Sequence, residues 1–423
     1  MKISNFKFQI KEIVTLITVI TFFLFTPSII SARERFFQVQ SIDTMKFSRD
    51  VARGKLKDFS YDKEIVIQVK NIAATGATHV AIATPYDDEF LPFLRRWVKA
   101  AREKGLNVWF RGNFSGWENW FDYEKFTDRK IHIEKTKKFI LENPDLFVDG
   151  DIFTSCPECE NGGPGDPRFT RDIEGYRNFL IEEYKTTKQA FGQIAKRVTS
   201  NYFSMNGDVA RLIMDKETTK ALDGVVTIDH YVSSYDRLVE DIKDYTQKSG
   251  GQVVLGEFGA PIPDIHGEMS EREQARWIDQ AMSKLIRIPE VVGINYWTNM
   301  ASSTQLWNSD HSPRKAVETI SKYFNPINLI GTIKDNNGQS LIEVTIKTKD
   351  KTAVVADGTY VLPVLDSESV TFSKFGYIST NITVRAENSK NLQKDIVLTK
   401  SYPSPIYSFM LKIINFVKTL LSK

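Results

Sequence analysis

The sequence predicts an α/β protein, with a (β/α)8 TIM barrel followed by a small all-β sandwich domain. Two observations support this fold class. From residue 36 to residue 324, short apolar or β-branched runs alternate with longer amphipathic stretches, the pattern of parallel β/α units. After Asn325-Pro326, strand-like runs alternate with turn signals instead. With 423 residues the chain exceeds one core of ordinary size, so two domains are expected.

We place the barrel at residues 33–325, where eight strand-like runs follow one another. Amphipathic stretches such as 90–104 and 270–286 separate them and indicate helices. A doubly wound open sheet is the alternative, but no Gly-rich phosphate loop follows the first run. Eight repeats in about 290 residues match the usual size of the barrel. The expected strands cover residues 36–40, 79–83, 107–111, 151–154, 197–202, 224–228, 253–255 and 291–297.

Residues 326–400 carry the pattern of a small antiparallel sandwich. A Gly-x-Ile-x-Asp-x-x-Gly opening spans Gly331 to Gly338, an Asp-Gly-x-Tyr turn begins at Asp357, and Phe375-Gly376-Tyr377 lies near the end. In these motifs the segment resembles the carboxypeptidase-regulatory-like (transthyretin-like) domains attached to many secreted enzymes. No catalytic constellation is visible in it.

The first 32 residues are expected to be a targeting segment. A basic start with Lys2, Lys7 and Lys11 precedes an apolar run over residues 13–30, and small residues close the run at Ser31-Ala32. Cleavage after Ala32 is favoured over retention as an N-terminal anchor. In either case the protein is expected to be exported, and to be secreted or held at the cell surface.

The last segment, residues 401–423, is expected to form a basic amphipathic helix. Apolar residues recur at helical spacing over residues 406–421, with lysines among them. Such a helix could lie on a membrane surface, or it could pack on its own protein or on a second copy. Both alternatives stay open.

Net charge and cysteine count argue against several classes of function. The formal net charge of +3 is small for this length and gives no support to a nucleic-acid partner. The two cysteines, Cys156 and Cys159, are too few for a disulfide scaffold. Their Cys-x-x-Cys spacing raises redox and zinc hypotheses, but a zinc site needs two more ligands and the five histidines are scattered. Neither a metal nor an organic cofactor is expected.

Acidic residues follow two of the expected strands, and an aromatic residue ends a third. Glu158 and Glu160 come after the fourth strand, Glu257 follows the seventh, and Trp297 ends the eighth. Active sites of such barrels lie at the carboxyl ends of the strands. Glycoside hydrolysis needs one carboxylic acid to protonate the leaving oxygen and one carboxylate to attack the anomeric carbon. The alternatives for these carboxylates are a helix cap, an ion pair or an ordinary loop position.

Residues 36–324 resemble the large clan of retaining glycosidases that includes family-five cellulases and β-mannanases. Gly-Glu-Phe-Gly around Glu257 is similar to the clan's nucleophile motif, and Pro-Glu-Cys-Glu-Asn around Glu158 is similar to a Thr-Glu-x-Glu-Ser segment of one β-mannanase family. The resemblance implies that Glu257 is the nucleophile and that Glu158 is the acid/base.

One departure from the clan's pattern lies at Pro157, where most members have an Asn that holds the sugar 2-hydroxyl. Either another residue takes that contact, or the segment aligns differently and Glu160 is the acid. We prefer Glu158. The candidates for the missing contact are Asn113, Asn161 and Asn201.

Several supporting residues fit the same face of the barrel. Arg111 ends the third strand, where a cation could hold the nucleophile ionised or form an ordinary salt bridge. His230 and Tyr231 end the sixth, where the clan often has His-x-Tyr with the Tyr contacting the nucleophile, so Tyr231 is favoured. Trp297 resembles the Trp under the sugar at the cleavage point, with barrel packing as its alternative. Trp117 is either a sugar-stacking platform or loop packing.

The expected function is therefore retaining hydrolysis of a β-linked polysaccharide or oligosaccharide by two carboxylates in a double displacement. Transglycosylation would use the same two carboxylates. A barrel that binds carbohydrate or a cell-wall component without cleaving it is the alternative from another class.

Overall fold

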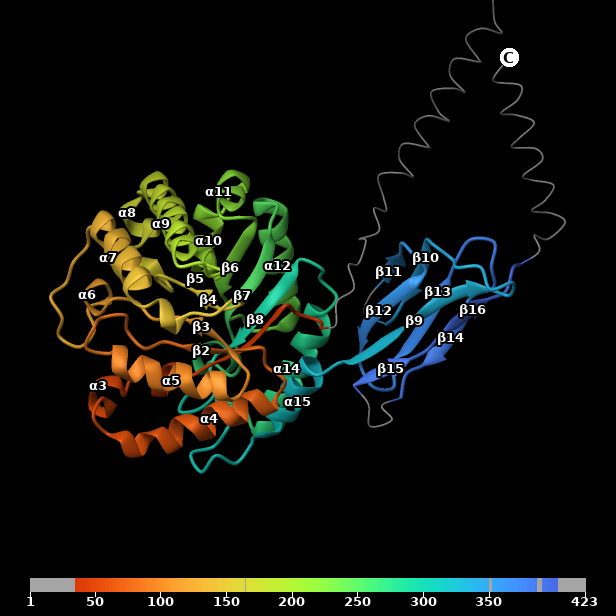
Figure 1. Cartoon of the computed structure of the whole chain (residues 1–423), viewed down its shortest axis with the longest axis horizontal. Helices are drawn as coiled ribbons and strands as arrows, with labels where there is room; N and C mark the ends of the chain where they lie inside the picture. The colour runs from red at the N-terminus through yellow and green to blue at the C-terminus, as the bar shows by residue number, and fades with distance from the viewer. Residues whose placement is uncertain (1–34, 164, 350–351, 386–389, 402–423) are drawn as a thin grey trace, which may run out of the picture. The chain divides into compact units, whose positions relative to one another are not determined.

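The computed structural model describes four stretches of the chain. The chain forms two compact units (Figure 1). One unit is Arg35–Asn325, and the other includes the chain from Pro326 onward. Within the described stretches no helix combines the length and the apolarity needed to cross a membrane. The predicted targeting segment at 1–32 and the predicted tail helix over 406–421 lie outside the described residues, which are 35–163, 165–349, 352–385 and 390–401.

Eight parallel strands form the sheet of the first unit, in the spatial order β4-β3-β2-β1-β8-β7-β6-β5. The sheet curls until its edges meet, because Ile152 of β4 forms a parallel bridge with Thr199, shortly before β5. The longer helices lie around the outside of the curled sheet (Figure 1). The (β/α)8 class is thus confirmed for this unit. Its strands are β1 Val39–Asp43, β2 His79–Ile82, β3 Asn107–Phe110, β4 Ile152–Phe153, β5 Ser204–Asn206, β6 Val225–Asp229, β7 Gln252–Phe258 and β8 Val291–Tyr296.

Local sequence signals account for where several helices begin and end. Ser270 caps α14 and exchanges hydrogen bonds with Glu273 in a capping box. Gly250 ends α12 in the left-handed conformation that glycine adopts without strain. The α-helices of this unit are α2 Met45–Ser48, α3 Ala52–Lys55, α4 Asp62–Ala74, α5 Leu91–Glu103, α6 Ser115–Glu118, α7 Arg129–Glu142, α8 Pro167–Thr170, α9 Ile173–Gln193, α10 Gly207–Ile213, α11 Lys216–Ala221, α12 Tyr235–Ser249, α13 Pro263–His266, α14 Glu271–Leu285 and α15 Lys315–Phe324.

A packed layer of apolar and aromatic side chains fills the barrel interior. Alternation along each strand sends every second side chain inward, so the residue two positions beyond Trp109, which is Arg111, also points into the barrel. The layer shields the polar groups at the carboxyl ends of the strands from water on one side. Its members are Val39, Ala81, Trp109, Ile152, Tyr202, Val225, Val254 and Val292.

Three strands lie later in the chain than the sequence predicted. The first begins at Val39 rather than residue 36 and ends at Asp43, and the sixth ends at Asp229. The prediction of a fifth strand at 197–202 was wrong, because that segment makes only a bridge at Thr199 and β5 starts at Ser204. The shifts matter because they place two further carboxylates, Asp43 and Asp229, at strand ends.

The second unit is built from strands in two sheets, which confirms the predicted all-β part of the fold. One sheet has the order β11-β10-β13-β14 and the other β12-β9-β15, with β16 pairing further along β9. Alternate residues of β9, including Leu329 and Ile333, are buried in its core. The resemblance to carboxypeptidase-regulatory-like domains stays a prediction. The strands are β9 Ile327–Asp335, β10 Val344–Lys347, β11 Thr352–Val355, β12 Thr359–Val364, β13 Ser369–Ser373, β14 Thr380–Thr383, β15 Asn391–Gln393 and β16 Ile396–Leu398.

Asp151, immediately before β4, ties the outer helix α5 to the sheet. Its side chain is fully buried, and its oxygens lie 2.8 and 2.5 Å from the guanidinium nitrogens of Arg102 on α5. The same oxygens accept the backbone N–H groups of Val108 and Val148 at 2.9 Å. Each carboxylate oxygen therefore has both a charged and a neutral donor.

We expect Asp151→Ala to lower the free energy of unfolding by about 3–5 kcal/mol, because it removes the counter-ion of a partly buried guanidinium and leaves a buried N–H without a partner. Asp145→Ala is the matched control. Asp145 pairs with Arg95 on the same helix but is 63% exposed, so its loss should cost about 1 kcal/mol or less. Chemical denaturation of both variants measures the difference, and equal losses would contradict the assignment.

Candidate active site

Arg111, just beyond β3, lies fully buried among carboxylates at the carboxyl ends of the strands. Its Nη1 lies 2.7 Å from Oδ2 of Asp43 and 3.3 Å from Oε1 of Glu257, and its Nη2 lies 3.3 Å from Oδ2 of Asp229. Burial opposes the guanidinium's charge, but the three carboxylates outweigh it and raise the pKa of Arg111. One guanidinium therefore joins the ends of β1, β6 and β7.

Glu257 lies near the end of β7, inside the strand rather than after it as the sequence predicted. Its Oε1 faces Arg111, and its Oε2 accepts a hydrogen bond of 2.8 Å from the hydroxyl of Tyr231. Burial raises the pKa of Glu257 to about 7, with Arg111 and Tyr231 opposing the rise and Glu158 and Asp43 adding to it. Both oxygens of Glu257 thus have donors that favour the ionised form.

Asp43 and Asp229 are site residues that the sequence reasoning missed. Asp43 also accepts a 3.2 Å hydrogen bond from Nδ2 of Asn295, and both Asp43 and Asp229 are buried. Burial, with the charge of Glu257 beside it, raises the pKa of Asp229 well above its usual value. The raised pKa favours the neutral form of Asp229, which leaves more of the charge of Arg111 to Asp43 and Glu257. Correct placement of the ends of β1 and β6 would have found both residues.

Glu158 lies on the loop after β4 and is only partly buried. Its backbone has a φ of 47°, in the left-handed region, and its N–H donates to the carbonyl of Ser204 at 2.8 Å. Its Oε2 accepts a 2.9 Å hydrogen bond from Nδ2 of Asn161. Burial and the neighbouring Glu160 raise the pKa of Glu158, against the opposing charges of Arg111 and Arg49. Such an environment favours a protonated carboxyl group.

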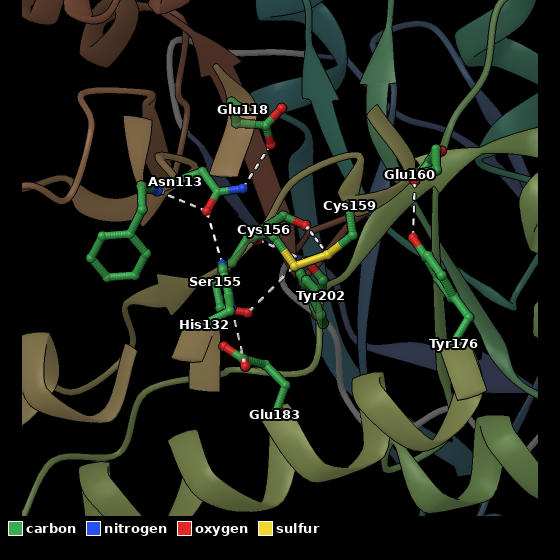
Figure 2. The surroundings of a disulfide bond; sticks show 12 residues. Asn113, Glu118, His132, Ser155, Cys156, Cys159, Glu160, Tyr176, Glu183 and Tyr202 are labelled. Atoms are coloured by element: carbon green, nitrogen blue, oxygen red, sulfur yellow. Dashed lines mark hydrogen bonds and ion pairs between the residues drawn. A yellow bond between two sulfur atoms is a disulfide. The ribbon is translucent and has the colours of Figure 1, made fainter. Parts of the chain in front are cut away.

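Glu160, two residues further on, is held by protein donors on both oxygens. Its Oε1 accepts hydrogen bonds from the backbone N–H and from Nδ2 of Asn206 at 2.7 and 3.1 Å. Its Oε2 accepts a hydrogen bond from the hydroxyl of Tyr176 at 3.3 Å, which Figure 2 shows. The residue is 3% exposed, whereas Glu158 is partly open. These contacts suit a structural role for Glu160 better than proton transfer to a ligand.

The three asparagines named for the sugar 2-hydroxyl have other partners. Asn113 donates to Glu118 and accepts from His132, and Asn201 donates to the carbonyl of Leu222. Both are buried. Asn161 is exposed and bonded to Glu158. The structure therefore brings only Asn161 next to the candidate acid, and the side chains of Asn113 and Asn201 are used within the protein.

The tryptophans predicted to contact sugar differ in solvent exposure. Trp297 is partly exposed, and its ring meets that of Tyr231 edge to face at 6.3 Å between centroids. Trp117 is fully buried against Phe126, His132 and other rings, so it packs the loop rather than presenting a platform for sugar. Trp120 in the same loop is partly exposed, and the Arg49 guanidinium lies over its ring at 4.8 Å.

His230 points away from Glu257. Its Nε2 lies 2.9 Å from Oδ2 of Asp241 on α12, and its ring meets that of Tyr245 edge to face. Its backbone N–H donates to the carbonyl of Glu257. Of the adjacent pair at the end of β6, it is therefore the Tyr231 side chain that reaches Glu257.

Cys156 and Cys159 form a disulfide in the loop that carries Glu158. Figure 2 shows it between the side chains of Asn113 and Glu118 on one side and Glu160 on the other. Across the described residues no group of three or more His, Cys, Asp or Glu side chains is arranged to hold a metal ion.

Glu118, at the end of α6, is a further carboxyl group near this loop and was not singled out from the sequence. Its Oε1 accepts a 2.7 Å hydrogen bond from Nδ2 of Asn113, whose Oδ1 in turn lies 3.0 Å from Nε2 of His132 (Figure 2). Burial raises the pKa of Glu118 to about 8, opposed by Asn113 and reinforced by Glu158. The loop after β3 therefore places a largely protonated carboxyl group beside the candidate acid.

Comparison with known proteins supports the fold. No protein-family model and no curated protein matches the chain. A GH5_18 protein from Streptomyces cattleya, crystallised with Manβ1-4GlcNAc, is similar over 72% of this chain and 85% of its own length, with a TM-score of 0.50 and 16% identity. Exo-β-1,4-mannosidase Op5Man5 from Opitutaceae bacterium strain TAV5 is similar over 72% of this chain and 64% of its own, with a TM-score of 0.50 and 11% identity. The likeness shows that these glycosidases and this chain share the barrel.

We expect Glu118→Gln to stabilise the protein at pH 7 and not at pH 4. The pKa of Glu118 is raised in the folded state, so the unfolded chain ionises first and wild-type stability falls as pH rises from about 4.5 to about 8. Gln keeps an acceptor for Asn113 and does not titrate. Allowing for partial exposure, the gain at pH 7 should be about 1–3 kcal/mol.

Thermal or urea unfolding at pH 4, 6 and 8 measures this effect. Glu142→Gln, an exposed carboxylate at the end of α7, is the control for a general change of charge. A difference between Glu118→Gln and wild type that stays constant across pH would contradict the raised pKa.

Proposed function

We propose that this protein is a retaining β-glycoside hydrolase, with Glu257 as nucleophile and Glu158 as acid/base. The observation that carries the proposal is the contrast between two carboxyl groups at the carboxyl end of the barrel. Glu257 has Arg111 and Tyr231 on its two oxygens, while Glu158 has one neutral donor and a raised pKa. Two carboxyl groups held in different environments are what acid-assisted glycosyl transfer requires.

In the first step, a carboxylate oxygen of Glu257 attacks the anomeric carbon while Glu158 gives its proton to the leaving oxygen. The products are a glycosyl-enzyme ester and the released sugar. In the second step, Glu158, now ionised, takes a proton from water, and that water attacks the same carbon to release the second sugar and restore both carboxyl groups. Arg111 and Tyr231 hold Glu257 ionised and oriented for the first attack.

The protonation states of these carboxyl groups set the pH range in which the cycle can run. Burial and the charge of Glu257 raise the pKa of Asp229 and favour its neutral form, which leaves more of the charge of Arg111 to stabilise Glu257. With its pKa near 7, Glu257 ionises fully only above neutral pH. Glu158 must keep its proton there, and the negative charge of Glu257 helps it to do so. The proposal therefore places activity at neutral to mildly alkaline pH.

Two partly exposed tryptophans suit the recognition of a sugar chain. Trp297 lies beside Tyr231, whose hydroxyl bonds to Glu257, and Trp120 belongs to the loop after β3. Of the two structural neighbours named above, one was crystallised with Manβ1-4GlcNAc and the other is an exo-β-1,4-mannosidase, which makes mannose-containing substrates the first to test. We also propose export, on the strength of residues 1–32.

A barrel that binds carbohydrate without cleaving it is the second candidate. The observation that favours it is Pro157, together with the internal use of Asn113 and Asn201, which leaves Asn161 as the remaining candidate for the usual 2-hydroxyl contact. Transglycosylation would share the first step of hydrolysis and would differ only in the acceptor.

The deciding experiment is hydrolysis of β-mannan, β-glucan, xylan and chitin fragments by wild type, Glu257→Gln and Glu158→Gln. We expect wild type to cleave at least one substrate with retention of anomeric configuration. Each substitution should lower kcat/KM by about 10³-fold or more. Glu160→Gln is the matched control and should keep most of the activity.

If hydrolysis is lost in Glu160→Gln and kept in Glu158→Gln, the acid/base is Glu160 and not Glu158. Binding of one fragment without any cleavage would support the non-catalytic alternative. Formation of longer products in place of hydrolysis would identify a transglycosylase.

Tyr231→Phe tests how the charge of Glu257 is held. The Tyr231 hydroxyl donates to Oε2 of Glu257 and lowers its pKa, so removal should move the acidic limb of the kcat/KM profile to higher pH. We expect a loss of about tenfold at pH 8 and a larger loss at pH 6. Tyr235→Phe, at the start of α12, is the control. An unshifted acidic limb would contradict the assigned role.

A further inference from the structure

The disulfide between Cys156 and Cys159 encloses the candidate acid/base in its ring. The two residues are three positions apart, with Cα atoms 5.1 Å apart, and Pro157 and Glu158 lie between them. Both cysteines are buried, at 0% and 2% exposure. The bond therefore constrains the backbone at the residue that the proposed mechanism uses for proton transfer.

The backbone of Glu158 adopts a conformation that is uncommon for a residue with a Cβ. Its φ of 47° lies in the left-handed region, which is disfavoured for side chains other than Gly, Asn and Asp. A change to right-handed φ would turn the Cα–Cβ bond and carry the carboxyl group with it. The direction of the Glu158 side chain thus depends on what holds this φ.

Four restraints act on this conformation. The N–H of Glu158 donates to the carbonyl of Ser204 at 2.8 Å, and its own carbonyl accepts the N–H of Asn161 at 2.8 Å. Pro157 limits its own φ, and the Cys156–Cys159 bond closes the ring around both residues. The hydrogen bonds can break as the loop moves, whereas the disulfide is covalent.

We propose that Cys156 and Cys159 are positioning residues for Glu158, and that their oxidation to the disulfide completes the acid/base. This rests on the proposed glycosidase function. The two thiols lose two protons and two electrons to a disulfide-containing oxidant by thiol–disulfide exchange: the protein S–S bond forms, the oxidant's S–S bond breaks, and two oxidant thiols result. The reduced protein keeps Glu257 and Arg111 in place, and it lacks only a correctly directed Glu158.

Contacts elsewhere in the barrel indicate that loss of the disulfide would change the loop around Glu158 and would not unfold the protein. The carboxyl end of the barrel is held by Arg111 and its three carboxylates, and none of these contacts involves a cysteine. A disulfide between cysteines only three positions apart also restricts the unfolded chain much less than one that closes a long loop would. Loss of the bond should therefore act chiefly on proton transfer by Glu158.

The test compares leaving groups that need a proton with leaving groups that do not. The probes are 2,4-dinitrophenyl and methyl β-glycosides of glucose, mannose, galactose, xylose and N-acetylglucosamine, together with the fragment panel above. Dinitrophenolate leaves without protonation, whereas methoxide and sugar alkoxides need an acid. Because kcat/KM reports formation of the glycosyl-enzyme, it isolates the step in which Glu158 acts as an acid.

For the full-length Cys156→Ser, Cys159→Ser double variant, we expect kcat/KM to fall by about 10- to 100-fold on methyl glycosides and fragments. On dinitrophenyl glycosides it should stay within about twofold of wild type. Glu158→Gln should show the same difference between the two kinds of leaving group, with a larger fall in kcat/KM on methyl glycosides and fragments. Wild type that has been reduced by dithiothreitol should behave like the double variant, and glutathione disulfide should restore it.

Dithiothreitol should not alter the double variant, which controls for other effects of the reductant. If the double variant does not fold, the reduced and reoxidised wild type gives the same comparison. Equal losses on both kinds of leaving group, or no loss on either, would overturn the positioning role while leaving the proposed function intact. Absence of hydrolysis by oxidised wild type on every probe would overturn the proposed function and this inference with it.

Discussion

The site is organised around one buried cation. Arg111 is removed from water by the packed barrel interior, a cost that is repaid only if carboxylates surround it. Asp43, Asp229 and Glu257 do so from the ends of three strands that are far apart in the sequence. The same contacts hold the rim of the barrel together and supply the positive charge that a nucleophilic carboxylate needs.

The charge balance around Arg111 then favours different protonation states for carboxyl groups that are chemically alike. One guanidinium does not offset three buried carboxylates, and burial with the charge of Glu257 raises the pKa of Asp229 and favours its neutral form. Glu257 keeps Arg111 and Tyr231 as partners. Glu158 lies on a loop, with no cation in direct contact among its described partners, so burial raises its pKa. Glu160 differs again, because Asn206 and Tyr176 occupy its oxygens.

Much of the fold could be predicted from sequence because its signals are local. Alternating side-chain direction in strands and the 3.6-residue period of helices appear within a few residues of each other, and the eightfold β/α order follows from counting them. Strand ends were less certain. Tyr202 looked like part of a strand because it is aromatic and lies in an apolar run, yet it fills the barrel interior just before β5.

The sequence by itself determined the barrel class, the all-β second unit, and the presence of Glu257, Arg111 and Tyr231 near strand ends. Only the tertiary structure decided which partners these groups have. Glu257 meets a guanidinium 146 residues away, Trp117 turns inward against other rings, and the asparagine side chains at 113 and 201 bond within the protein. Hydrogen bonds, burial and pKa values depend on such distant neighbours, and the spacing of residues along the chain carries no record of them.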